Sequence, residues 1–249
     1  MEFEKWDRNK HAELVPYFFS EHVVEPKKTD KYKNVISIAL EDIEEIYGVK
    51  ADFKIVFAEI DVEKFREQFN GDIPPHVFFR GYSKSETVHG EVDENLMFLA
   101  TSDKYEHWEP GLKDLVVHEE SHFEFFRIWG SMDNAIWGQI LFEGHAKFRE
   151  KEVIEKKDYY WQGRQDSFNG DVEKVKEELD KIQTRDNLDC MFNFGGEKWP
   201  NAKGYVIAID VYRNIIKRHN LDTDAPLMKD REWLRKEIEK SLKKLYDED

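Results

Sequence analysis

The most constraining feature of this sequence is the stretch from Leu115 to Trp129, which predicts a strongly apolar helix. Its apolar residues are Leu115, Val116, Val117, Phe123, Phe125, Phe126, Ile128 and Trp129. A helix that is hydrophobic nearly all round is buried. The same stretch carries His118, Glu119 and His122. Because unpartnered polar groups are costly inside a core, these three side chains must find partners there.

Patterns on either side of this helix indicate the fold class. Helical patterns cover 7–20, 31–47, 61–69, 112–127, 133–155, 171–183, 203–219 and 230–246. Gly48 follows the second of these as a C-terminal capping glycine. Strand-like patterns occupy 53–57, 76–79 and 95–100. Strands early and helices later predict an α+β chain, with a small mixed sheet in the N-terminal half and a mainly helical C-terminal half.

The length of 249 residues allows one large domain or two intimate lobes. We expect an N-terminal α/β lobe over 1–110, holding the sheet and its edge strand. A helical lobe over 111–249 then carries the apolar helix and the helix that follows it. The two lobes are expected to form one continuous unit.

The composition limits which classes of binding partner and which cellular compartment we expect for this protein. A net charge of −15 argues against nucleic acid and against an anionic membrane surface, since both require basic residues. The single cysteine, Cys190, excludes an intramolecular disulfide. The N-terminus has no apolar run of the secretory kind, and no stretch approaches the ~20 apolar residues of a membrane span. We therefore expect a cytoplasmic protein; the sequence gives no prediction of its oligomeric state.

Metal chemistry is indicated by the segment His118-Glu119-Glu120-Ser121-His122. Residues four apart on a helix project from one face, so both imidazoles can bind one Zn²⁺. Glu119 adjoins the first ligand, where its carboxylate can reach a water on the metal without binding the metal itself. This is the H-E-x-x-H pattern, in which the glutamate acts as general base.

A catalytic zinc normally has three protein ligands, and two residues compete for the third place. Glu143 follows His122 with twenty residues between them, enough for the chain to reverse and bring back an antiparallel helix. His145 lies two residues on, about 200° away around a helix, so both cannot face one metal. Mostly apolar neighbours favour Glu143 as the ligand. Gly144 and Ala146 would let another helix approach closely.

The two segments together resemble the gluzincin arrangement, an H-E-x-x-H with a glutamate about twenty residues downstream. More closely, they are similar to a family of uncharacterised bacterial proteins predicted to be zinc-dependent proteases, the YjaZ-like group. That family carries a later E-G-x-A, matched here by 143–146, and a Gly/Tyr-containing helix, matched by 203–208. The resemblance covers roughly 110–215. It implies a zincin-like fold, in which the edge strand of a small mixed sheet runs beside the active-site helix. Gluzincins often have an aspartate one turn after the glutamate ligand, where this chain has Lys147.

Other residues are weaker candidates for a role in the metal site. The hydroxyl of Tyr205 could stabilise an oxyanion as a catalytic group, or Tyr205 could be a core residue. His76, His89 and His107 lack ligand spacing, and no base is suggested for Cys190. If 96–100 is the edge strand, it could pair with an extended peptide, or a loop could cover it.

These observations predict a zinc-dependent hydrolase, in first place a metallopeptidase whose substrate is a peptide or protein. His118, His122 and Glu143 hold Zn²⁺, and Glu119 is the general base. Two alternatives stay open: a zinc hydrolase of a non-peptide amide or ester, and a non-enzymatic binding protein on a zincin scaffold. The presence of Glu119 argues against the second, because a metal-only role needs no general base.

Overall fold

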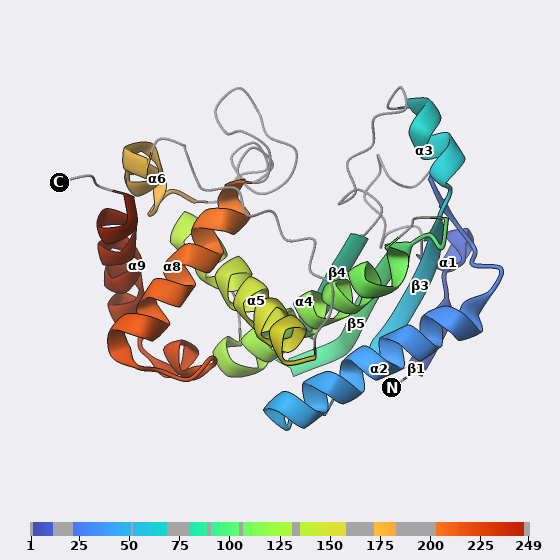
Figure 1. The fold of residues 1–249 in the computed structure, drawn as a ribbon, viewed down its shortest axis with the longest axis horizontal. Helices are drawn as coiled ribbons and strands as arrows, with labels where there is room; N and C mark the ends of the chain where they lie inside the picture. Colours follow the sequence, from blue (N-terminus) through green and yellow to red (C-terminus); the bar gives the residue numbers. More distant parts are fainter. Residues whose placement is uncertain are drawn as a thin grey trace. The chain divides into compact units, whose positions relative to one another are not determined.

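A computed structural model describes most of the chain, over residues 2–11, 22–50, 52–68, 80–88, 91–104, 107–130, 135–157, 172–182 and 203–246. The chain divides into two compact units. The first comprises Met1–Phe123 with Glu152–Gln162, and the second comprises Glu124–Lys151 with Gly163–Asp249. The divisions fall inside two continuous helices that Figure 1 labels, α4 (Trp108–Trp129) and α5 (Ile136–Lys157).

The first unit is built on a mixed sheet. Its strands are β1 (Glu2–Lys5), β2 (Val23–Val24), β3 (Lys54–Ile60), β4 (Arg80–Val88) and β5 (Glu91–Thr101). The order is β1-β3-β5-β4, with β2 antiparallel to β3. β3 runs parallel to both β1 and β5, whereas β4 runs antiparallel to β5. The expected α+β class, with its sheet in the N-terminal half, is confirmed.

Residues 96–100, which the sequence suggested as a candidate edge strand, lie inside the sheet. This segment belongs to β5, which pairs with β3 on one side and with β4 on the other. The edge strand next to β5 is β4, at 80–88, which the sequence did not reveal. Its residues are largely polar, Arg-Gly-Tyr-Ser-Lys-Ser-Glu-Thr-Val, without the apolar alternation that marks a half-buried strand.

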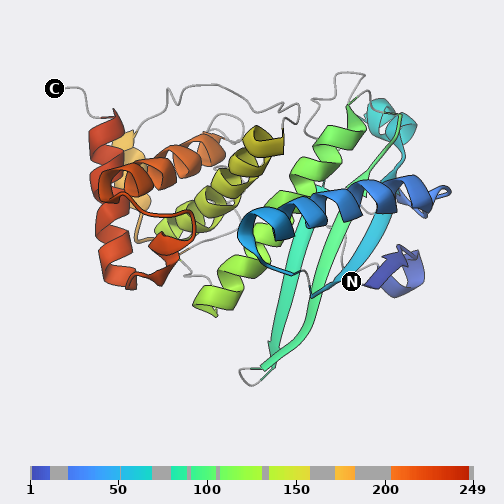
Figure 2. The same ribbon diagram turned by 60° about the horizontal axis from the view of Figure 1, so that its bottom comes forward.

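Two long helices pack on one face of this sheet, as Figures 1 and 2 show. They are α2 (Thr29–Tyr47) and the first part of α4 (Trp108–Trp129). Ile36 of α2 and Val116 of α4 are fully buried in one cluster with Phe57 and Leu99 of the sheet. Alternate strand residues, among them Val56 and Phe98, are buried on the opposite face. β3 is therefore buried on both faces, as is usual for a strand with parallel neighbours.

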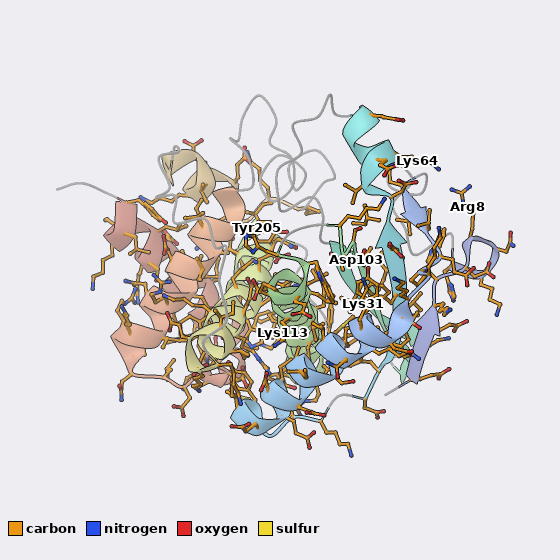
Figure 3. All side chains as sticks on the ribbon, turned by 45° about the vertical axis from the view of Figure 1, so that its right-hand side comes forward. Arg8, Lys31, Lys64, Asp103, Lys113 and Tyr205 are labelled. Carbon is orange, nitrogen blue, oxygen red and sulfur yellow. The ribbon has the colours of Figure 1, made fainter. Side chains whose placement is uncertain are left out.

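The N-terminal ends of α2 and α4 are joined by a cluster of polar and aromatic groups. Lys31 forms an ion pair with Asp103 (Figure 3), and its amino group lies 4.8 Å from the ring centroid of Tyr32 and 5.2 Å from that of Trp108. The backbone N–H of Asp103 donates to the Tyr32 hydroxyl at 3.0 Å. These contacts join the N-terminal end of α2 to Asp103, which follows β5, and to Trp108 at the start of α4.

Most helix boundaries lie within three residues of the predicted patterns, but α4 begins earlier than predicted and α6 (Val172–Glu178) ends five residues before the predicted 183. Of the predicted helix 7–20, residues 12–20 lie outside the described residues. α2 ends at Gly48, which is left-handed (φ 68°) and donates to the Glu44 carbonyl at 2.8 Å, as expected for a capping glycine. α4 begins at Trp108, four residues before the predicted 112. Pro110 lies in its first turn, where a missing N–H costs no helical hydrogen bond. The short helices α1 (Arg8–His11) and α3 (Val62–Gln68) complete the first unit.

The second unit is helical in its described residues. It contains the end of α4, most of α5 (Ile136–Lys157), α6 (Val172–Glu178), α8 (Lys203–His219), the 3₁₀ helix η5 (Ala225–Met228) and α9 (Arg231–Tyr246). Its core includes Phe125, Ile140, Ala208 and Ile238, all fully buried. None of the helices in the described ranges is long and apolar enough to cross a membrane.

Candidate metal centre

Helix α4 presents two buried histidines one turn apart. His118 is 8% exposed and His122 is 5% exposed. Their Nε2 atoms lie 3.2 Å apart, and the ring planes meet at 82°. The adjoining Val116 and Val117 are fully buried in the sheet-facing cluster, which fixes the rotation of the helix. Between the histidines, the Ser121 hydroxyl donates to the Val117 carbonyl at 2.7 Å and so has its partner within the helix.

Glu143 of α5 supplies a third donor. One ligand atom from each of His118, His122 and Glu143 lies within 4.8 Å of the others, and all three residues are buried. Gln139, one turn earlier on α5, donates through Nε2 to Glu143 Oε1 at 3.0 Å. This hydrogen bond orients the Glu143 carboxylate.

The donor set fits a zinc ion. Two nitrogens bound to one tetrahedral zinc at about 2.0–2.1 Å lie roughly 3.3–3.4 Å apart. The observed Nε2–Nε2 distance is 3.2 Å. A hydrogen bond between two neutral imidazoles has a similar length, so the third donor is what distinguishes the two cases. A buried carboxylate brings a negative charge that a cation would balance, and two histidines with one glutamate is a ligand set of catalytic zinc sites.

His145, the rival for the third place, is not part of this group. It is fully buried, and its Nε2 lies 2.8 Å from Asp224 Oδ1. Its ring contacts those of Phe125 and Tyr212, with centroids 6.2 and 5.8 Å away. The structure therefore brings Glu143, and not His145, together with the two α4 histidines.

The pKa values of His145 and Asp224 indicate a neutral imidazole that donates to a carboxylate. Burial lowers the pKa of His145 below its ordinary value, although the hydrogen bond with Asp224 opposes this shift. Burial by itself raises the pKa of Asp224, but the His145 hydrogen bond and the charge of Arg149 hold it below its usual value. A lowered pKa favours the neutral imidazole, and a neutral ring that faces the Asp224 carboxylate through Nε2 donates its proton from that nitrogen.

Glu119 is also buried, at 5% exposed, and directly follows His118 on α4. It is one of several buried carboxylates on this helix, since Glu120 is 2% and Glu124 is 3% exposed. Glu124 has a clear partner in Arg127, whose Nε donates to it at 2.7 Å. Glu119 has the sequence position of the general base.

Tyr205 lies in the first turn of α8 and is half-buried (Figure 3). The amino group of Lys147 lies 5.7 Å from its ring centroid and also donates to Glu150 at 2.6 Å. Lys147 thus lies one turn beyond Glu143 on α5 and contacts Tyr205. The catalytic role of the Tyr205 hydroxyl stays a prediction.

Of the remaining sequence candidates, only His107 lies in the described part of the chain, and it does not belong to the group that could hold a metal ion. His107 is half-buried just before α4. His76, His89 and Cys190 lie outside the described residues. Among the described histidine, cysteine, aspartate and glutamate side chains, the group of His118, His122 and Glu143 is the one arranged to hold a metal ion.

Sequence reasoning missed Asp224, which anchors His145. A weak signal was present: Arg149 follows His145 by four residues, so a basic and a polar side chain share one face of α5 and require a carboxylate.

Comparison with known proteins adds nothing to the assignment of this site: no family model, no curated protein and no solved structure matches the chain.

Proposed function

We propose that this protein is a zinc-dependent hydrolase that cleaves peptide bonds, with the metal held by His118, His122 and Glu143. The observation that carries the proposal is the convergence of three buried donor atoms within 4.8 Å. The sequence already places two of these donors in an H-E-x-x-H segment.

The chemistry follows from the residues around this group. A bound zinc ion would supply Lewis acidity toward the carbonyl of the scissile bond. Glu119 takes a proton from the attacking water and returns it to the leaving amine nitrogen. His118 and His122 serve as neutral ligands through Nε2. Gln139 keeps the Glu143 carboxylate oriented as these events proceed.

A zincin-like arrangement and a peptide substrate are supported by the sheet. α4 packs on β5 through Val116 and Leu99, and β5 pairs with β4 at the sheet edge. The outer side of β4 pairs with no other described strand. An extended peptide could add to such an edge through backbone hydrogen bonds and lie along the metal-binding helix.

The proposal is tested by metal analysis and a peptide library. Protein stripped of metal and then reloaded should bind one zinc per chain and cleave members of a mixed peptide library, as mass spectrometry would detect. The His118→Ala protein should do neither. Absence of stoichiometric zinc would contradict the metal centre. Hydrolysis of small esters or amides without any peptide cleavage would replace the peptidase by a hydrolase of small molecules.

A further inference from the structure

The second unit contains a buried charged cluster that the proposed chemistry does not use. His145 and Arg149 lie one turn apart on α5, and both are fully buried. Both contact Asp224, in the turn between α8 and η5. His145 Nε2 lies 2.8 Å and Arg149 Nη1 lies 3.7 Å from Asp224 Oδ1. One carboxylate thus connects that turn to two successive turns of α5.

The turn that carries Asp224 is itself held in place. The Tyr212 hydroxyl of α8 donates to the Thr223 carbonyl at 2.7 Å. Tyr212 also packs against His145, with ring centroids 5.8 Å apart. The turn that carries Asp224 is therefore held by α8, and the Asp224 carboxylate contacts α5 from this turn.

α5 packs closely against α8 at Gly144, the residue between Glu143 and His145. A Cβ atom on Gly144 would lie 2.5 Å from the Ala208 carbonyl oxygen and 3.1 Å from Tyr212 Cβ. The helices meet at this glycine, and the Asp224 contacts act on the same side of α5. Together they fix both the depth and the rotation of the helix.

The rotation of α5 determines where Glu143 points. Glu143 and His145 are two residues apart, so their side chains leave the helix about 200° apart. Whatever holds His145 and Arg149 therefore sets the direction of Glu143 on the other side. With side chains at about 5–6 Å from the helix axis, a rotation of ~10° displaces a carboxylate by ~1 Å. Such a displacement exceeds the ~0.5 Å tolerance of a metal or catalytic site.

We propose that Asp224 is a positioning residue for the metal centre: by holding His145 and Arg149 it fixes the rotation of α5 and so aims Glu143 at the two histidines of α4. The inference rests on the proposed function, because it takes His118, His122 and Glu143 as zinc ligands. It assigns Asp224 no contact with metal or substrate.

The test compares Asp224 with a matched carboxylate in the same unit. Glu237 of α9 is 2% exposed and also binds a histidine and an arginine, His219 at 2.8 Å and Arg218. It joins α9 to α8, and the described contacts do not connect it to α5. Asp224→Ala and Glu237→Ala therefore each remove a carboxylate from a His/Arg pair, but only the first releases α5.

Zinc affinity is measured by competition with a chromogenic chelator, together with the visible spectrum of the Co²⁺-loaded proteins. Asp224→Ala should weaken zinc binding by about 10- to 100-fold, the usual effect of losing an outer support of a ligand. Its Co²⁺ bands should shift, because the ligand geometry changes. Asp224→Asn, which keeps a hydrogen-bond acceptor for His145, should lose less than about tenfold. Glu237→Ala should retain the parental affinity and spectrum.

Parental zinc affinity in Asp224→Ala would overturn the inference, as would an equal loss of affinity in Glu237→Ala. Should Asp224→Ala fail to fold, the pair His145→Gln and His145→Leu decides. Glutamine keeps an N–H donor for Asp224 and should keep most of the affinity, whereas leucine should not; equal affinities would contradict the proposal. A parent protein that binds no zinc would refute the proposed function itself, and this inference with it.

Discussion

At the scale of single residues, the proposed function gives two buried glutamates different roles because helical geometry places them differently. Glu119 directly follows His118 on α4, a position that suits a base acting beside the metal. Glu143 lies on α5 with its donor atom among the ligand group, held by Gln139. The side chains are chemically alike, so only their positions separate a base from a ligand.

Glu119→Gln should separate metal binding from catalysis. The amide keeps the size of the side chain but cannot accept and return a proton at neutral pH. Zinc stoichiometry should stay at the parental value while turnover on a cleaved peptide falls by roughly 10²–10⁴-fold, the usual contribution of a general base. Atomic absorption and a quenched-fluorescence peptide assay measure the two quantities. Parental turnover in Glu119→Gln would exclude the assigned role.

Glu143→Gln and His145→Gln should differ in their affinity for metal. The first replaces the charged donor that balances Zn²⁺, so zinc binding should fall strongly. The second leaves the ligand group intact and keeps a donor for Asp224, so it should keep most of the zinc affinity and lose less than about tenfold. Competition of both variants against a chromogenic chelator at neutral pH gives the ranking. If His145→Gln proves to be the metal-free protein, the assignment of Glu143 is wrong.

The sequence predicted that Glu143 would lie near His118 and His122 but not that Asp224 would contact His145, and the reason is distance along the chain. His118 and His122 are linked by local helical spacing, and apolar flanking residues favoured Glu143 over His145. Asp224 follows His145 by 79 residues, and no local pattern connects the two. Only the folded chain brings them to 2.8 Å.

At the scale of elements, the crossing of α5 and α8 depends on one glycine. The sequence suggested that Gly144 and Ala146 would admit another helix, and α8 does approach Gly144. The strands were harder to predict. β1 has only four residues and β4 is largely polar, so neither shows an apolar alternation. The place of β5 within the sheet depends on its partners β3 and β4, which local sequence patterns do not identify, so the sequence could not decide whether 96–100 lies at the edge.

Gly144→Ala should destabilise the protein although alanine is the better helix former. In an open helix this change stabilises by roughly 0.5–1 kcal/mol. Here the added methyl group would lie 2.5 Å from the backbone oxygen of Ala208, which cannot turn aside as a side chain could. We expect a net loss of about 1–3 kcal/mol, typical of overpacking. Urea unfolding followed by circular dichroism measures the sign; a more stable variant would show that the helices are not in contact there.

At the scale of the whole molecule, the α+β class followed from the order of the patterns, whereas the division into units did not. Residues 152–162 belong to the first unit although the preceding 124–151 belong to the second. α4 and α5 each run through a division, so no break in composition marks it. The sequence of a continuous helix does not show whether all of it packs within one unit or whether its two ends belong to different units.

Global stability should fall in alkaline solution partly because of Tyr32. Burial, with a smaller effect from Glu59, raises the pKa of Tyr32 above its ordinary value. The folded state therefore favours the neutral phenol, so this stability is fully present below the unfolded pKa of about 10 and is lost as pH rises above it. The slope for one such group approaches ~1.4 kcal/mol per pH unit. Urea titrations of parent and Tyr32→Phe between pH 8 and 11 should show a shallower slope in the variant; parallel curves would exclude this coupling.

Removal of the metal should lower the melting temperature of the whole molecule, because a ligand bound only by the folded chain adds its binding free energy to stability. With free zinc at 100 times its dissociation constant, the gain is ~2.7 kcal/mol. For a chain of this size each kcal/mol corresponds to about 2–4 °C, so the shift should be roughly 5–11 °C. Scanning calorimetry with zinc and with excess chelator measures it. His118→Ala and His122→Ala, each lacking a ligand, should melt at the same temperature in both solutions. Identical melting of the parent in both would mean that the buried histidines and Glu143 hold no metal tightly, and that their closeness has another cause.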